Sequence, residues 1–151
     1  MMCEVDHTEQ FSVSARSESE TKTTVTAREF EFTVDEPAKL EGTNEGPNPV
    51  EYLLGAWAGC LNVVAHTVAD ERGIDLTGVD LEVDGDLDPR RLLGVSDEAR
   101  AGFQEIRVHL DVATDVDDDA LTAFIEAVED RCPVGDNIGT ETPTVVSANT
   151  I

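Results

Sequence analysis

The sequence is poor in basic residues, and this scarcity limits what the protein can bind. Its 151 residues include 10 Lys and Arg against 33 Asp and Glu, which gives a formal charge of -23. Nucleic acids and anionic membranes are bound mainly through Lys and Arg, which replace the counterions of the phosphates. We therefore expect no nucleic acid and no membrane among its partners.

The acidic residues are spread along the chain instead of forming a tail, and 40% of all residues are apolar. This composition favours a folded chain with a polyanionic surface over a disordered chain. Dense surface carboxylates are typical of cytosolic proteins from halophiles, because salt screens the repulsion between them. The sequence thus predicts a halophilic origin and a loss of stability in dilute buffer.

Long apolar runs and regular cysteine patterns are also missing. No signal-peptide core occurs near the N-terminus and no run reaches 18 apolar residues, so we expect a cytoplasmic protein. Cys3, Cys60 and Cys132 are an odd number at wide spacing, unlike the disulfide framework of a secreted scaffold. In a reducing compartment such cysteines are either reactive or simply buried.

The sequence offers no convincing metal site. No two Cys or His residues are closer than Cys3 and His7, whereas structural zinc sites use four ligands, commonly in close pairs. The acidic run at residues 115–119 is similar to a calcium loop, but Ala120 stands where that loop requires glycine. We interpret the run as the charged start of a helix, and we expect no metal.

Periodicity predicts the fold class. Alternating apolar residues indicate strands at 11–15, 30–34, 79–83 and 106–112, and a Thr-rich run indicates another at 21–27. Residues 144–147 are a candidate for a final strand. Helices are expected from Pro49 to Gly73, from the acidic run to Arg131, and from Pro133 to Gly139. The polar stretch 85–102 is expected to form a long surface loop. The order β-β-β-α-β-β-α-β predicts one α+β domain over residues 1–151, with a mainly antiparallel sheet.

The first of these helices has strong start signals. Asn48 is a favourable N-cap, Pro49 suits the first helical position, and Glu51 completes a capping box with Asn48. Residues 53–69 are apolar at nearly every position, so we expect protein to surround the helix on most sides. Cys60 would then lie in a dry environment near its middle.

Cys60 and Cys132 are the candidates for chemistry. Either could be a structural residue, since a free cysteine is usually a small buried hydrophobe. Cys132, however, precedes Pro133 at the start of a short helix, where unpaired N–H groups lower a thiol pKa. Together the two cysteines fit a thiol that becomes a sulfenic acid and a second thiol that resolves it. His66 lies about 120° around the helix from Cys60, so we expect a hydrogen-bonded core or interface histidine.

Two motifs carry a resemblance to a known family. One is Gly-Pro-Asn-Pro-Val-Glu-Tyr-Leu-Leu at residues 46–54 followed by Ala-Gly-Cys at 58–60, and the other is Arg-Cys-Pro-Val at 131–134. They resemble the OsmC/Ohr family of organic hydroperoxide reductases, in particular its OsmC-like branch. The resemblance implies an OsmC-like fold with a long buried central helix. It also implies an intertwined homodimer with its active sites at the subunit interface.

The same resemblance implies a mechanism without metal or cofactor. Cys60 would be the peroxidatic thiol, and Cys132 would resolve its sulfenic acid to a disulfide. A dithiol reductant, either lipoyl or another small or protein thiol, would then reduce the disulfide. An arginine from the N-terminal strands would stabilise the Cys60 thiolate, with Arg28 favoured over Arg16.

The chain departs from the family pattern at one position. The glutamate that usually holds this arginine lies ten residues before the first cysteine, where this chain has Val50. Glu51 is one position away and is better explained as the partner of Asn48 in the capping box. Cys3 receives no role, because it lies close to the terminus.

The sequence therefore predicts a cysteine-based peroxidase. The apolar residues Trp57, Leu61 and Leu53 near Cys60 favour organic hydroperoxides over hydrogen peroxide. The alternative is an OsmC-like binding module or redox sensor with little peroxidase activity, and the absence of the usual glutamate keeps this alternative open.

Overall fold

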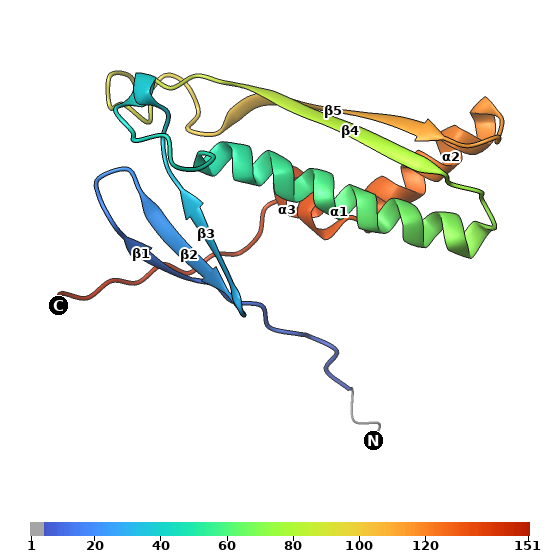
Figure 1. Cartoon of the computed structure of the whole chain (residues 1–151), viewed down its shortest axis with the longest axis horizontal. Coiled ribbons are helices and arrows are strands. Elements are labelled where there is room, and N and C mark those ends of the chain that lie inside the picture. Colours follow the sequence, from blue (N-terminus) through green and yellow to red (C-terminus); the bar gives the residue numbers. More distant parts are fainter. Residues whose placement is uncertain (1–4) are drawn as a thin grey trace. The chain divides into compact units, whose positions relative to one another are not determined.

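The computed structural model describes residues 5–151, which divide into two compact units. The first unit ends at Tyr52 and the second is Leu53–Ile151. The long helix α1 (Pro49–Arg72) begins in the first unit and continues into the second (Figure 1).

The first unit contains a three-stranded antiparallel sheet in the order β1-β2-β3. Its strands are β1 (Ser14–Ser17), β2 (Thr23–Ala27) and β3 (Phe30–Val34), and a short 3-10 helix, η1 (Ala38–Leu40), follows. The prediction of a first strand at residues 11–15 is displaced, because pairing with β2 begins at Ser14 opposite Thr26. Phe11 and Val13 precede the strand and are exposed.

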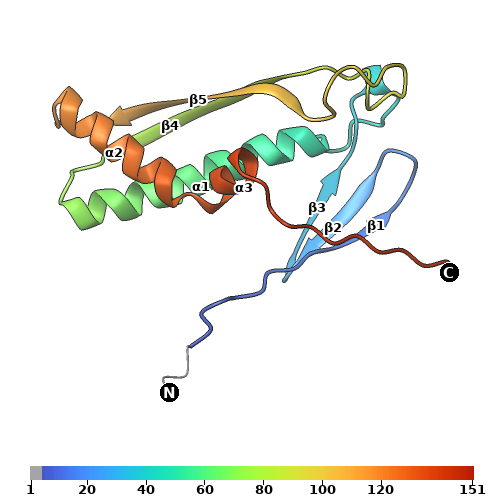
Figure 2. The same cartoon turned by 180° about the vertical axis from the view of Figure 1, so that it is seen from behind.

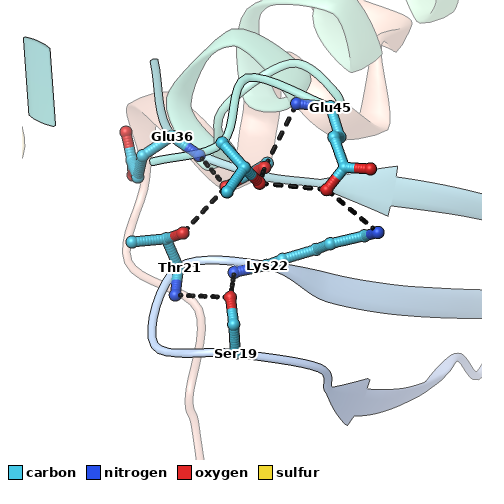
Figure 3. Close-up of polar contacts among 7 residues, drawn as sticks. Ser19, Thr21, Lys22, Glu36 and Glu45 are labelled. Atoms are coloured by element: carbon cyan, nitrogen blue, oxygen red, sulfur yellow. Dashed lines mark hydrogen bonds and ion pairs between the residues drawn. The ribbon is translucent and has the colours of Figure 1, made fainter. Parts of the chain in front are cut away.

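The loop after β3 is organised around the buried carboxylate of Asp35 (Figure 3). Its oxygens accept hydrogen bonds from the hydroxyls of Thr21 and Thr43 and from the backbone N–H groups of Glu36 and Glu45. The Thr43 hydroxyl, together with the other donors, holds the pKa of Asp35 well below its usual range. The Asp35 N–H also donates to the Pro47 carbonyl at 3.1 Å, which fixes the chain just before α1.

Helix α1 starts and ends as predicted. The Glu51 N–H donates to Asn48 Oδ1 at 2.9 Å, and the Asn48 N–H donates to Glu51 Oε1 at 3.0 Å. This reciprocal pair is a complete capping box. At the other end Gly73 adopts a φ of 65°, and the Ile74 N–H donates to the Ala69 carbonyl at 2.9 Å. The helix thus ends in a left-handed glycine, which carries no steric penalty there.

The second unit contains an antiparallel ribbon and two further helices. The ribbon is formed by β4 (Gly78–Leu87) and β5 (Phe103–Ala113), and it is followed by α2 (Asp118–Arg131) and α3 (Pro133–Gly139). The predicted loop is shorter than expected, since β4 extends to Leu87. The antiparallel pairing therefore occurs in two sheets, one in each unit.

The core of the second unit lies where α1 meets α2. Its fully buried side chains include Leu61 and Val68 of α1, Phe124 and Val128 of α2, and Cys132. Leu81, Val108 and Val112 of the ribbon pack against this cluster. The two views show the ribbon along α1, with α2 and α3 on another side of the helix (Figures 1 and 2).

The prediction that protein surrounds α1 on most sides is wrong for the single chain. Its buried residues are Leu61, Ala65, Val68 and Ala69, which form one stripe, whereas Val63 is 64% exposed. The physical reason is that the ribbon and α2 cover only part of the helix circumference. By length and hydropathy alone α1 could also cross a membrane, but its buried stripe packs on α2.

The predicted strand at residues 144–147 is also wrong. Residues 141–151 adopt no regular structure, and Val145 and Val146 are almost fully exposed. The consecutive β-branched residues Thr144, Val145 and Val146 favour an extended chain, but a strand also needs a hydrogen-bonding partner. Within residues 5–151 this segment has no such partner.

Candidate active site

The fold brings Cys60 and Cys132 together from distant parts of the sequence. Cys60 lies in the middle of α1, and Cys132 lies between α2 and α3. Both are free thiols, and Cys132 Sγ donates a hydrogen bond to Cys60 Sγ at 3.0 Å. The pairing that the two sequence motifs imply is therefore possible without rearrangement of the chain.

The two thiols differ in exposure, and Cys60 is less protected than the dry environment predicted for it. Cys132 is 1% exposed and belongs to the core, whereas Cys60 is half-buried. Cys60 is the less protected thiol because its neighbour Leu61 points into the core, which leaves Cys60 at the edge of the packed stripe. A reagent from solution would thus reach Cys60 before Cys132.

Cys132 is held by the start of α3. Its backbone is extended, with a φ of -82° and a ψ of 108°, as expected for a residue before proline. Its sulfur accepts a hydrogen bond from the Gly135 N–H at 3.4 Å, and its carbonyl accepts one from the Asp136 N–H at 2.9 Å. Cys132 is therefore the N-cap of α3, as predicted.

The predicted lowering of the Cys132 pKa is wrong. Burial raises the pKa of the Cys132 thiol, and its hydrogen bond to Cys60 raises it further, while the Gly135 N–H opposes them more weakly. Desolvation outweighs the N-cap position because the sulfur is almost fully removed from water. Cys132 thus remains a protonated thiol at neutral pH.

Trp57 and Gly135 complete the surroundings of the two sulfurs. Trp57 lies one turn before Cys60 on α1, and its indole lies directly against Gly135 of α3. Sequence reasoning named Trp57 but missed Gly135. The available signal was a glycine, a poor helix former, in the first turn of the helix that follows Cys132 and Pro133.

The predicted supporting residues Arg28 and Arg16 both belong to the first unit. Arg28, in the turn after β2, has a left-handed φ of 54°, forms an ion pair with Glu29 at 3.6 Å and lies 5.0 Å from the centre of the Phe30 ring. Arg16 forms an ion pair with Glu18 at 2.7 Å. Their proposed role toward Cys60 stays a prediction.

Glu51 has the capping role that was predicted, since both of its contacts with Asn48 are formed. His66 Nδ1 lies 2.9 Å from the Asn62 carbonyl, so it is hydrogen-bonded as expected, and in the single chain it is exposed and not part of the core. Leu61 is in the core, whereas Leu53 is partly exposed and remains available to a substrate. Cys3 lies outside the described residues.

The acidic run before α2 is a helix start, as interpreted. Asp117 is the N-cap of α2, and its carboxylate accepts a hydrogen bond from the Ala120 N–H at 2.8 Å. Asp118 and Asp119 occupy the first turn, where the helix dipole favours negative charge.

Comparison with known proteins agrees with this fold. The chain is 23% identical over 124 residues to a protein of Mycoplasma genitalium named hydroperoxide reductase, covering 82% of this chain and 83% of that protein. The crystal structure of an OsmC-like protein from Mycoplasma pneumoniae superposes with a TM-score of 0.77 at 21% identity, covering 88% of this chain and 89% of that one.

A further solved structure is the organic hydroperoxide resistance protein OsmC of Legionella pneumophila, with a TM-score of 0.67 at 18% identity. The match covers 88% of this chain and 91% of that one. Likeness at this level of identity establishes the α+β OsmC-like fold. The family model described as OsmC-like protein matches residues 42–147, which include both cysteines of the site. The chain therefore belongs to the OsmC-like family.

Proposed function

We propose that the protein is a thiol-dependent peroxidase that reduces organic hydroperoxides through a sulfenic acid at Cys60 and a disulfide between Cys60 and Cys132. The observation that carries the proposal is the 3.0 Å distance between the two sulfur atoms. A disulfide bond is about 2.05 Å long, so a small movement of either side chain would allow the bond to form. The name of the Mycoplasma genitalium relative supports the same reaction.

The difference in burial supports the assignment of roles. Half-buried Cys60 is accessible to a peroxide, whereas buried Cys132 has a raised pKa and stays protonated. Thiolates and not thiols attack peroxides, so Cys132 is a poor first nucleophile. It is well placed to react with the sulfenic acid that forms beside it.

Each proposed step conserves atoms and electrons. The Cys60 thiolate attacks one peroxide oxygen, the S–O bond forms as the O–O bond breaks, and the alkoxide leaves and takes a proton to become the alcohol. Cys132 then loses its proton and attacks the Cys60 sulfur, which releases water and forms the disulfide. A dithiol reductant reduces this disulfide and is itself oxidised.

The substrate and the assembly are also proposals. Trp57 and Leu53 give the approach to Cys60 an apolar character, which favours an alkyl hydroperoxide. The exposed apolar side of α1 supports a homodimer in which a second copy covers this helix. In such an assembly Arg28, or else Arg16, would stabilise the Cys60 thiolate. The reducing cytoplasm would supply the dithiol.

The test is consumption of cumene hydroperoxide in high salt with a dithiol reductant. Cys60→Ser is expected to abolish consumption, and Cys132→Ser is expected to accumulate a sulfenic acid that a sulfenic-specific reagent captures. Equal consumption by the wild type and Cys60→Ser would exclude the peroxidase. Hydrogen peroxide is the matched second substrate and is expected to react more slowly.

A redox sensor is the second candidate, and the N-terminal turn of α1 favours it. Val50 stands where the family's usual acid would lie, and the neighbouring Glu51 carboxylate accepts from the Asn48 N–H in the capping box, so this turn carries no acid dedicated to an arginine. A sensor would form the disulfide with peroxide but turn over slowly with every dithiol supplied. Rapid turnover in the same assay would exclude this candidate.

A further inference from the structure

Trp57 lies beside the sulfur pair with an unsatisfied polar group. Its Nε1 atom is buried and has no hydrogen-bond partner among the described residues. Buried tryptophans usually place this N–H on an acceptor, and leaving it unpaired costs free energy. The orientation of the indole is therefore set by what it packs against and not by a hydrogen bond.

The indole packs against Gly135. A Cβ atom added to Gly135 would lie 2.9 Å from Trp57 Nε1, which is closer than real Cβ contacts allow, and 3.4 Å from Trp57 Cε2. The ring thus occupies the space that a side chain at position 135 would need. Gly135 has a φ in the ordinary range, so this close approach, and not backbone strain, is what favours glycine there.

The same glycine also touches the resolving thiol. The Gly135 N–H donates to Cys132 Sγ at 3.4 Å, and the space for its missing Cβ lies 3.6 Å from Cys132 Cβ. On α1, Trp57 and Cys60 are three residues apart and share a face. The α1–α3 junction therefore has two neighbouring contacts, indole to glycine and sulfur to sulfur.

Helix α3 is too short to hold its own position. It has seven residues, and helices of this length are marginal in water without tertiary packing. The position of its first turn, which carries Cys132, thus depends on side chains that it packs against. Trp57 is a large side chain in contact with that turn.

We propose that Trp57 and Gly135 act as a spacer that sets the separation of Cys132 and Cys60, and so determine how readily the two thiols form a disulfide. Both are positioning residues and neither touches the reacting oxygen. The proposal rests on the proposed function in assigning a use to the disulfide. The geometric claim can be tested without peroxide.

The spacer proposal predicts the effect of adding a single methyl group at position 135. Gly135→Ala is expected to push the first turn of α3 away from Trp57 and to separate the sulfurs. Misplacement of reacting groups by about 1 Å can cost a reaction about 100-fold, so we expect the effective concentration of the thiol pair to fall by about tenfold or more. Gly139→Ala is the matched control, because it adds the same methyl to the same helix and meets no atom within 4 Å.

A compensating change tests the contact itself. The smaller ring of Trp57→Phe removes the Nε1 edge that the new methyl would meet, so the double variant Trp57→Phe with Gly135→Ala is expected to recover most of the loss. Should Gly135→Ala fail to fold, Trp57→Ala replaces it as the test variant. Removal of the indole would also leave the first turn of α3 free to move. Thermal unfolding confirms that each variant is folded before it is measured.

The measurement is the equilibrium between dithiol and disulfide in glutathione buffers, in the salt that keeps the protein folded. The spacer would be supported by an effective concentration that falls strongly in Gly135→Ala, is unchanged in Gly139→Ala and recovers in the double variant. Equal effective concentrations in Gly135→Ala and Gly139→Ala would overturn it, as would a Gly135→Ala loss that Trp57→Phe does not relieve. A wild type that fails to consume peroxide would overturn the proposed function and leave this result unaffected.

A single turnover with cumene hydroperoxide gives the corresponding kinetic result. Loss of the Cys60 thiol is expected to change much less than the second step in Gly135→Ala, because Cys132 contributes only a hydrogen bond to the first step and is the nucleophile in the second. The sulfenic acid is expected to persist about tenfold longer or more, because the attack by Cys132 is slowed. An unchanged sulfenic acid lifetime in a folded Gly135→Ala protein would contradict the spacer.

Discussion

Cys132 is a titratable group in the core, and its raised pKa has a consequence for stability. The folded, reduced protein holds the Cys132 proton more tightly than the unfolded chain, because burial and the Cys60 contact disfavour the thiolate. Its contribution to stability is therefore complete below the unfolded thiol pKa of about 8.5 and is lost as the pH rises through the raised pKa.

We expect the melting temperature of the reduced wild type to fall more steeply above about pH 8.5 than that of Cys132→Ser, whose hydroxyl does not ionise in this range. Melting curves recorded with a reductant present test this expectation. Parallel pH dependences for the two proteins would contradict the raised pKa.

Asp35 is the opposite case, a buried carboxylate with a lowered pKa. Its stabilising effect is present above the unfolded pKa of about 3.9 and is lost as the pH falls through the lower folded value. Asp35→Asn is expected to destabilise the protein clearly at neutral pH, because an amide cannot accept from all four donors around it. Thr21→Val, which removes one donor, should cost less.

Urea unfolding at neutral pH and at about pH 2.5, below the unfolded carboxyl pKa of about 3.9, measures both effects of Asp35. The difference in stability between wild type and Asp35→Asn should shrink as the solution becomes acidic. A difference that is independent of pH would show that the carboxylate charge does not matter.

Sequence reasoning identified Cys60, Cys132 and Glu51 because their signals are local: a capping box, a proline after a cysteine, and two short motifs. The difference in burial between the two cysteines was not predictable, since it depends on how α1 and α2 pack. The contact of Trp57 with Gly135 joins distant residues through tertiary structure, and periodicity carries no information about it.

At the scale of elements, the first turn of α1 allows a structural role of Glu51 to be tested separately from a catalytic role. Glu51→Gln preserves the capping box, because a glutamine can also accept from the Asn48 N–H. We expect its stability and peroxide rate to match the wild type. Asn48→Ala, which removes the N-cap, is expected to cost about 1 kcal/mol.

Urea unfolding and the cumene hydroperoxide assay distinguish the two roles of Glu51. A peroxide rate that drops in Glu51→Gln while stability is unchanged would show that the carboxylate acts beyond the cap.

The helix boundaries were predictable because the residues that cap and end a helix lie at its ends, whereas β4 and β5 extend beyond the predicted strands 79–83 and 106–112. Asn48 and Gly73 bound α1, Asp117 begins α2, and Pro133 separates α2 from α3. The strand expected at residues 144–147 failed because pairing is not local. The β-branched run of Thr144, Val145 and Val146 predicts an extended chain, and it does not specify a partner strand.

For the whole molecule, the uncovered side of α1 predicts self-association. The 16.3 kDa chain is expected to have twice this mass in solution, with α1 in the interface. Val63→Asp, which adds a charge to the exposed side of α1, is expected to yield monomers. Leu92→Asp, at a similarly exposed position in the loop 88–102, is the control. Light scattering measures the mass of each protein in solution, and a monomeric wild type would contradict the dimer.

The charge of -23 acts on the whole molecule through repulsion, and its range depends on salt. The screening length falls from about 30 Å at 0.01 M to about 3 Å at 1 M ionic strength. We therefore expect the melting temperature to rise with KCl, by about 2–4 °C for each 1 kcal/mol of repulsion removed in a chain of this size.

The ribbon contains a local instance of this repulsion, because Asp80 of β4 lies directly opposite Asp111 of β5 and both are exposed. Like charges at such a cross-strand pair are destabilising. Asp80→Asn is thus expected to raise the melting temperature in dilute buffer and to have little effect in molar KCl, where the wild-type pair is already screened. A wild-type melting temperature that is unchanged between the two buffers would exclude charge repulsion as a limit on stability, and an Asp80→Asn effect of equal size in both would show that this pair acts through something other than screened charge.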